Sequence, residues 1–292
     1  MKRKRRMEEN NLFEEAKMLI RAGALQKLEH LLNEHPYLVR QRDIPDHRNI
    51  QNTLLHEVTG MGDVEWSEEA PKIACMLIQK GAAVNAREQH YEGETPLHHA
   101  VSINNVPVTE VLLKNGANPE LNGRYGGKID TALGYALFYG TDIRLKRFFR
   151  DAPQLLQDYG AVIHLPHAAA MNDMDILVNA FTVDGRLKSS YANGDTQLTL
   201  QQALLFACKY GNVDAAAFLV RRGAKVNAII PFFHQYASAL HIAVEAGNQV
   251  EMVRFLLSSG ANSKLKDKVY NSTPEGWAMF CGQDEVYRIL RR

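Results

Sequence analysis

The chain has 292 residues, of which 46% are hydrophobic and 23% are charged, and its formal net charge is +1. This balance is typical of a folded protein and argues against a chain that is disordered throughout. No stretch approaches the roughly 18 consecutive apolar residues of a membrane span, so we expect none. The length suits two globular domains, or one array of repeats that grows without enlarging a single core.

The first residues form a basic segment, Lys2 to Arg6, which runs directly into polar and acidic residues. Because no apolar stretch follows it, we expect no secretory signal, and we expect residues 1–10 to be a disordered tail. Outside this segment 29 basic residues face 33 acidic ones, which gives a formal charge of −4. Nucleic-acid-binding domains are usually basic across a folded face, so we expect no nucleic-acid partner.

The three cysteines, Cys75, Cys208 and Cys281, are odd in number and lie far apart. They form no Cys-x-x-Cys pair and no local group with histidine, so they predict neither a disulfide framework nor a metal site. We interpret them as reduced, buried small residues of a cytoplasmic protein. The basic segment leaves a nuclear location open.

A pattern of about eight copies follows from residue 11 onwards. The first copy, which contains Leu28 to Val39, ends in a Pro-x-Leu sequence. The third copy is the clearest, because Thr95 is placed to cap a helix and Pro96 suits the first helical position. Gly116 suits the left-handed residue that ends a second helix. Each copy therefore predicts a helix, a tight turn, an antiparallel helix and a projecting loop.

The later copies vary this pattern. The segment from Leu145 to Leu156 matches Leu28 to Val39 in its apolar and proline positions, so we predict that Pro153 and Leu155 close the fourth copy. Small residues at one helix position allow neighbouring helices to approach closely: Ala100, Ala136, Ala169, Ala207 and Ala243. The predicted boundaries are approximately 11–48, 49–90, 91–126, 127–161, 162–197, 198–234, 235–268 and 269–292.

The repeated unit resembles the ankyrin repeat, and its spacing of about 37 residues slightly exceeds the ankyrin period of about 33. The resemblance implies an all-α repeat solenoid of stacked helix-turn-helix ankyrin repeats with projecting loops. It covers a single domain over residues 11–292. Neighbouring copies must stack because one pair of helices cannot bury its apolar face alone.

The sequence contains no recognisable catalytic motif, neither a phosphate-binding loop nor a nucleophile elbow. A histidine recurs at one point of the repeat, in His56, His98, His167 and His241. In the ankyrin family this histidine hydrogen-bonds between neighbouring loops, and the resemblance implies the same structural role here. His98 and His99 point to different sides of a helix and cannot chelate one metal together. We therefore predict no catalytic residue, no metal and no cofactor.

Aromatic residues mark the predicted loop tips: Tyr91, Tyr125, Tyr191, Phe232, Phe233, Tyr236 and Tyr270. Exposed aromatic side chains are favoured in binding surfaces, because they bring a large contact area. We predict a monomeric, non-catalytic scaffold that binds a protein partner through its loop tips and concave helical face. Each ring could instead fold back onto its own loop or onto the next repeat.

Two other functional hypotheses stay open. The basic segment could direct a regulator or effector to the nucleus or to a membrane surface. An enzyme site could also lie between repeats without a recognisable motif. Two long loops, 60–71 and 182–196, are either functional or disordered, and the sequence does not decide between these alternatives.

Overall fold

The computed structural model describes residues 2–43, 51–59, 68–88, 93–123, 128–139, 141–142, 147–148, 151–191, 195–232, 235–247 and 249–291. The chain divides into two units by its internal contacts. The N-terminal unit comprises residues 1–126, 130–142 and 148–162, and the C-terminal unit comprises residues 127–129, 143–147 and 163–292.

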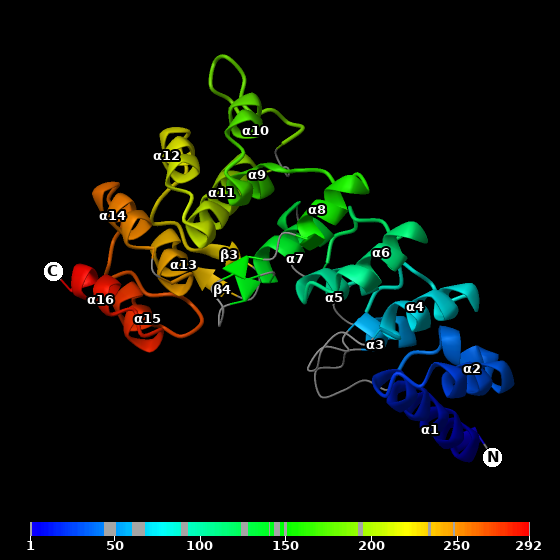
Figure 1. The fold of residues 1–292 in the computed structure, drawn as a ribbon. Helices are drawn as coiled ribbons and strands as arrows, with labels where there is room; N and C mark the ends of the chain where they lie inside the picture. The colour runs from blue at the N-terminus through cyan, green and yellow to red at the C-terminus, as the bar shows by residue number, and fades with distance from the viewer. Residues whose placement is uncertain are drawn as a thin grey trace. The chain divides into compact units, whose positions relative to one another are not determined.

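The N-terminal unit consists of two layers of helices (Figure 1). Its inner layer contains α1 (Lys2–Arg21), α3 (Leu54–Thr59), α5 (Pro96–Ser102) and α7 (Ala132–Tyr139). Its outer layer contains α2 (Leu25–Glu34), α4 (Ala70–Gln79), α6 (Val106–Lys114) and α8 (Asp151–Asp158). Successive helices contact one another within each layer, and each inner helix contacts the outer helix that follows it. The unit is therefore a stack of helix pairs, as the repeats predict.

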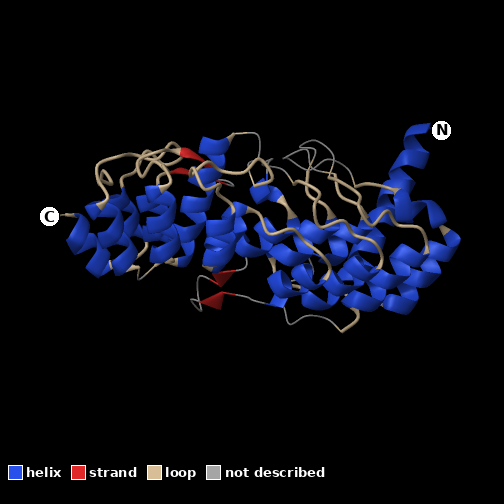
Figure 2. Cartoon of the chain, turned by 90° about the horizontal axis from the view of Figure 1, so that it is seen from above, coloured by secondary structure: helices blue, strands red, loops and turns tan. Residues whose placement is uncertain are grey.

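The C-terminal unit repeats this arrangement. Its inner layer contains α9 (Leu165–Met171), α11 (Thr196–Tyr210), α13 (Ala239–Glu245) and α15 (Pro274–Phe280). Its outer layer contains α10 (Met174–Asn179), α12 (Val213–Arg221), α14 (Val250–Ser258) and α16 (Asp284–Leu290). Strands β3 (Ile230–Phe232) and β4 (Gln235–Ala237) pair antiparallel, with Ile230 opposite Ala237. Figure 2 shows this hairpin among the loops of the unit.

Four short elements complete the described structure. A 3₁₀ helix, η1 (Pro36–Arg40), follows α2, and a second one, η2 (Lys128–Asp130), precedes α7. Two short strands, β1 (Thr141–Asp142) and β2 (Arg147–Phe148), occur between α7 and α8.

The third repeat shows how the local sequence sets the fold. Thr95 caps α5 and forms a capping box with His98, while Pro96 occupies the first turn, as predicted. Asn105 caps α6 by accepting the N–H of Val108 at 3.2 Å. Gly116, with φ +85°, then ends the helix in the left-handed conformation that favours glycine. The predicted order of helix, turn, helix and loop is confirmed here.

The interface between inner helices is apolar and closely packed. The five alanines predicted to allow close approach are all buried: Ala100, Ala136, Ala169, Ala207 and Ala243. Large buried side chains such as Leu97 and Phe206 fill the space beside them. Burial of these surfaces between repeats supplies the main stabilisation of each unit.

The N-terminal segment differs from the expected disordered tail. Helix α1 runs without a break from Lys2 to Arg21, so residues 2–10 are helical. The segment is rich in lysine, arginine and glutamate, which have high helix propensity. It continues into a turn that anchors the helix through Phe13, Ala16 and Ile20, all of which are buried. Because helix extension is easier than nucleation, the anchored turns favour the helix beyond them.

The fourth repeat also corrects the sequence analysis. Helix α8 begins at Asp151, where the second helix was predicted to end, and Pro153 lies in its first turn. The helix is followed by Gly160, with φ +83°, and the N–H of Ala161 donates to the Leu156 carbonyl at 2.9 Å. This repeat therefore keeps the glycine-alanine closure, and the predicted closure at Pro153 and Leu155 is wrong. Proline is compatible with the first turn because no intrahelical donor is needed there.

The long loop of the fifth repeat contains a tight turn. Phe181 and Leu187 form an isolated bridge, and the N–H of Thr182 donates to the Arg186 carbonyl at 2.8 Å. Residues 192–194 of this loop, and residues 60–67 of the other long loop, lie outside the described residues.

Burial of the cysteines was predicted correctly for one of the three. All three are free, and Cys208 is buried, but Cys75 and Cys281 are half-buried.

Within the described part of the chain, no helix combines the length and the apolar character needed to cross a membrane.

Candidate functional site

Only part of the predicted aromatic row can be followed in the structure. Three of its residues lie outside the described part of the chain, namely Tyr91, Tyr125 and Phe233. Phe232 ends β3, and its side chain is likewise outside that part. Tyr191 is half-buried. By contrast, Tyr236 is 41% exposed and Tyr270 is 69% exposed, so a partner can reach both rings.

These two tyrosines lie on neighbouring loop segments of the C-terminal unit. The N–H of Lys268 donates to the Tyr236 carbonyl oxygen at 2.9 Å, and Lys268 Nζ lies 5.9 Å from the centre of the Tyr236 ring. Val269, between Lys268 and Tyr270, is also exposed. We call Tyr236, Lys268, Val269 and Tyr270 the tip patch. It combines apolar and aromatic surface with a cation, which is a composition that protein interfaces favour.

Asp267 holds the loop of the tip patch in one conformation. Its carboxylate accepts the N–H groups of Val269 at 2.8 Å, Tyr270 at 2.6 Å and Ser272 at 2.9 Å. It also accepts the indole N–H of Trp277 at 3.0 Å. Burial alone would raise the pKa of Asp267, but these hydrogen bonds favour the charged form and lower the pKa. Lys268, Val269 and Tyr270 of the tip patch are thus presented by a preorganised loop, which reduces the entropy that binding would cost.

Three of the four histidines that recur in the repeat link neighbouring repeats, as the resemblance implies: His56, His98 and His241. The Nε2 atoms of His56, His98 and His241 lie 3.2, 3.1 and 3.0 Å from the carbonyl oxygens of Glu94, Asp130 and Ser272. Each carbonyl precedes the next inner helix. In the fourth such histidine, Nδ1 of His167 accepts the N–H of His164 at 3.2 Å. Burial lowers the pKa of His98 to about 4 and that of His56 well below its usual value. Burial also lowers the pKa of His241, so His56, His98 and His241 act as neutral structural groups.

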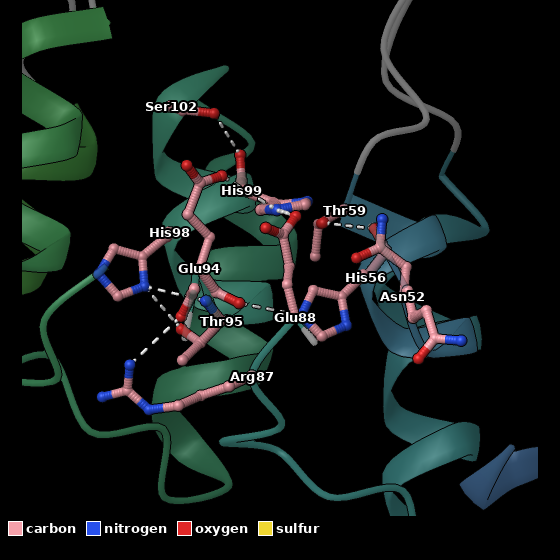
Figure 3. Close-up of polar contacts among 12 residues, drawn as sticks. Asn52, His56, Thr59, Arg87, Glu88, Glu94, Thr95, His98, His99 and Ser102 are labelled. Carbon is pink, nitrogen blue, oxygen red and sulfur yellow. Dashed lines mark hydrogen bonds and ion pairs between the residues drawn. The ribbon is translucent and has the colours of Figure 1, made fainter. Parts of the chain in front are cut away.

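A second group of polar residues lies between the second and fourth repeats and was not predicted. His99 Nε2 on α5 lies 2.9 Å from Glu88 Oε1 and 3.2 Å from Glu94 Oε2, both in the preceding loop (Figure 3). The Tyr135 hydroxyl on α7 donates to Glu94 Oε1 at 2.8 Å. We call Glu88, Glu94, His99 and Tyr135 the His99 cluster. One donor atom from each of Glu88, Glu94 and His99 lies within 4.8 Å of the others.

The charges of this cluster are strongly coupled. Burial alone would lower the pKa of His99, but the hydrogen bonds and negative charges of Glu88 and Glu94 outweigh it and raise the pKa to about 9. Burial would raise the pKa of Glu94, whereas its bonds to His99 and Tyr135 lower it. The cluster thus places two carboxyl groups against one imidazolium. His98 is therefore neutral, whereas its neighbour His99 on the same helix is charged.

The cluster is partly open to solvent. The side chains of His99 and Glu94 are 20% and 18% exposed, whereas that of Glu88 is only 5% exposed. The His56 ring lies edge-on to the His99 ring, with 5.2 Å between their centres. Gly93 leaves room for Glu88, because a Cβ atom at Gly93 would lie 2.9 Å from Glu88 Oε2. A small ligand could reach His99 and Glu94 from one side.

The sequence did contain a signal for this cluster. Glu88 follows Gly81 by seven residues, just as Asp267 follows Gly260. The two residues also make equivalent loop bonds, because the N–H of Glu88 donates to the Glu94 carbonyl and the N–H of Asp267 donates to the Ser272 carbonyl. His99 follows the recurring histidine at a position that is the buried Ile242 in the seventh repeat. A histidine at a place that is buried in the seventh repeat requires polar partners, and the loop before the helix is in reach to supply them.

The structure also exposes an apolar pair that sequence reasoning missed. Met279 and Phe280, at the end of α15, are 70% and 92% exposed. The corresponding place in the third repeat, Val101, is fully buried against the next repeat.

Comparison with known proteins now places the fold. A family model described as ankyrin repeats, in three copies, matches residues 64–145 and 166–267, which is more than half of the chain. The chain belongs to the ankyrin repeat family. Ankyrin repeats are generally protein-protein interaction domains, so the family assigns this chain a binding fold. The matched residues include Glu88, Glu94 and Asp267.

The related proteins are much longer than the matching segments. The chain is 38% identical over 69 residues to the ADP-ribosylation factor GTPase-activating protein AGD2 of Arabidopsis thaliana, which covers 24% of this chain and 8% of that protein. It is 32% identical over 119 residues to ankyrin repeat and SOCS box protein 6 of Mus musculus, covering 41% of this chain and 27% of that protein. Among solved structures, the chain is 24% identical to the crystallised ankyrin repeat domain of Bcl-3, with a TM-score of 0.40. The alignment covers 95% of this chain and 97% of the Bcl-3 chain.

Proposed function

We propose that this ankyrin repeat chain is a non-catalytic scaffold that binds a protein partner through its loop tips and concave helical face. The observation that supports this most directly is the tip patch, in which Tyr236 is exposed on β4 and Tyr270 is exposed on the neighbouring loop held by Asp267. Exposed aromatic rings on a preorganised loop contribute contact area at a low entropic cost.

The chemistry of the tip patch favours one kind of partner. Tyr236, Val269 and Tyr270 offer apolar surface, and the Lys268 ammonium lies beside the Tyr236 ring. A matching surface would therefore present an apolar side chain next to a carboxylate, which can pair with Lys268 at the rim of the contact.

A non-catalytic role is consistent with the state of the buried histidines. His56, His98 and His241 each bind a loop carbonyl through Nε2, so these atoms already serve the stacking of repeats. The match to the Arabidopsis GTPase-activating protein covers only 8% of that protein, so its named activity is not transferred to this chain. The cytoplasmic location and the monomeric state stay predictions.

The proposal is tested by affinity capture followed by a binding measurement with the purified partner. The wild-type chain is compared with the double variant Tyr236→Ala/Tyr270→Ala. The matched control is Tyr37→Ala/Tyr159→Ala, which removes two tyrosines of the N-terminal unit that are 43% and 39% exposed. We expect a partner whose Kd rises at least about ten-fold for the tip variant and stays unchanged for the control.

Two results would count against this assignment. Equal affinity of the partner for both variants would move the interface away from the tip patch. Turnover of a small molecule by the purified chain, abolished by a single substitution, would contradict the non-catalytic role.

A further inference from the structure

We propose that the His99 cluster binds one divalent transition-metal ion, with Zn²⁺ as the best match, through His99 Nε2, one oxygen of Glu88 and one oxygen of Glu94. The three ligands come from one helix and the loop before it (Figure 3). Tyr135 supports them from the next repeat through its hydrogen bond to Glu94. This inference is independent of the proposed partner surface, which lies in the C-terminal unit.

Two of the three distances between donor atoms are close to those of a tetrahedral site. Zinc lies about 2.0–2.2 Å from nitrogen and oxygen ligands, so two ligands of one ion are about 3.3–3.5 Å apart. His99 Nε2 lies 2.9 Å from Glu88 Oε1 and 3.2 Å from Glu94 Oε2, and all three donor atoms lie within 4.8 Å of one another. His99 Nε2 therefore needs to move only a few tenths of an ångström from each carboxylate oxygen to make room for the ion. One nitrogen and two oxygens also form a donor set that Zn²⁺ accepts.

The charge of the cluster favours a divalent cation. Two carboxylates and one neutral imidazole around a divalent ion give formal charges that sum to zero. Because unbalanced charge is costly in a partly buried site, a bound divalent ion lowers the electrostatic cost of burying both carboxylates.

The surroundings of the cluster orient the ligands. The Tyr135 hydroxyl occupies Glu94 Oε1 and so leaves Oε2 directed at His99. Hydrogen bonds of this kind to ligating carboxylates are typical of metal sites, where they fix the ligand and tune its basicity. The partial exposure of His99 and Glu94 provides a path for the ion and space for a water molecule as a fourth ligand.

Other repeats place different residues at these positions. Counted from the closing glycine and from the helix cap, the positions of Glu88 and His99 are Ile230 and the buried Ile242 at the seventh repeat. At the eighth repeat they are Asp267 and Trp277, and the indole N–H of Trp277 donates to the carboxylate at 3.0 Å. The same two positions therefore hold apolar residues at the seventh repeat, a hydrogen-bonded pair at the eighth and, at the third, a glutamate beside a histidine that also contacts Glu94.

Binding exchanges one proton for one metal ion. The imidazolium of His99 loses its Nε2 proton to solvent, the Nε2 lone pair binds the ion, and one oxygen of each glutamate completes the protein ligands. The step involves no oxidation or reduction.

The experiment is a Zn²⁺ titration of the chelator-treated full chain, read by competition with a colorimetric chelator. A parallel titration with Co²⁺ is read by its visible absorption. We expect one equivalent to bind, with proton release and with higher thermal stability of the folded chain. Co²⁺ bound by oxygen and nitrogen lacks the intense charge-transfer band of a thiolate complex, which separates this site from the half-buried Cys75 and Cys281.

Variants connect the bound ion to the cluster. Two single variants remove a ligand each. Glu88→Gln, which keeps the shape of the side chain, and His99→Gln should each weaken Zn²⁺ binding by at least about ten-fold. Tyr135→Phe should weaken it by about ten-fold, because Glu94 loses the hydrogen bond that orients it. The control is His30→Gln, because His30 lies 3.7 Å from Glu34 in an exposed pair outside the cluster. We expect no change for this control.

Two outcomes would overturn the metal site. One is the absence of a bound equivalent in a wild-type chain that circular dichroism shows to be folded. The other is binding of equal strength in wild type, Glu88→Gln and His99→Gln. Neither outcome affects the partner proposal, which depends on Tyr236 and Tyr270.

Discussion

The third and seventh repeats use the same helix position in opposite ways. In the third repeat, His99 is charged and bonded to two loop carboxylates. In the seventh repeat this position is Ile242, which is fully buried. The backbone of the two repeats is alike, with a capping histidine whose Nε2 reaches the next loop. The comparison teaches that the stack fixes the helices but leaves this position free for either packing or chemistry.

The largest effect is expected from breaking the cluster on one side only. His99→Ala removes the cation and leaves Glu88 and Glu94 as unpaired carboxylates, of which Glu88 is almost completely buried. Removal of one partner from such a group costs about 3 kcal/mol of unfolding free energy. Urea denaturation followed by circular dichroism measures this loss.

The triple variant Glu88→Gln/Glu94→Gln/His99→Leu gives the matched control. It makes the third repeat resemble the seventh, and it should recover most of the stability lost in His99→Ala. A triple variant as unstable as the single one would mean that the two repeats differ in more than this cluster.

Acid pH should lower the free energy of unfolding through the buried neutral histidines, above all His98. The pKa of His98 falls from 6.5 in the unfolded chain to about 4 in the folded one. Neutral His98 therefore contributes fully to the free energy of unfolding above pH 6.5. This contribution, roughly 3 kcal/mol, is lost as the pH falls through 4. Urea denaturation across this range checks it, and His98→Asn should flatten the slope. A slope unchanged in that variant would assign the loss to other groups, such as His56 or His241.

Alkaline pH should act on His99 in the opposite sense. Because its folded pKa is raised to about 9, its stabilising contribution is complete below 6.5 and is lost as the pH rises through 9. The expected loss is also roughly 3 kcal/mol, reduced by the partial exposure of the ring. The triple variant should lack this alkaline loss while it keeps the acid loss from His98. If the wild type is equally stable on both sides of pH 9, the charged state of His99 is contradicted.

A smaller effect is expected at Tyr135. Tyr135→Phe removes the hydroxyl that donates to Glu94 Oε1 at 2.8 Å. A hydrogen bond to a charged group contributes about 1.5 kcal/mol, and the partial exposure of Glu94 lets water replace part of it. Phe206→Tyr in the C-terminal unit is the reverse test, because it adds a hydroxyl to a fully buried side chain and should destabilise the chain.

The smallest effect on stability is expected in the tip patch. Tyr270→Ala removes an exposed ring and should change the free energy of unfolding by less than about 0.5 kcal/mol. Trp277→Phe, in contrast, removes the indole donor to Asp267 and should loosen the loop, at a cost of about 1 kcal/mol. Thermal denaturation of both variants measures the difference. A loss as large for Tyr270→Ala would show that its ring supports the fold.

The sequence by itself determined the ankyrin fold. Thr95, Pro96 and Gly116 act through the backbone within a few residues, so their effect is readable without knowledge of distant parts of the chain. The recurring histidines were equally readable, because one residue type at the same place of four repeats, in His56, His98, His167 and His241, reports the shared geometry.

Only the tertiary structure decided the rest. Whether α1 extends to Lys2, where α8 begins and which rings are exposed all depend on packing against neighbouring helices and loops. The His99 cluster shows this most clearly, since Tyr135 and Glu94 are separated by 41 residues and meet only when the repeats stack. Local patterns record the conformational preference of the backbone, whereas such a contact arises from the folding of the whole unit.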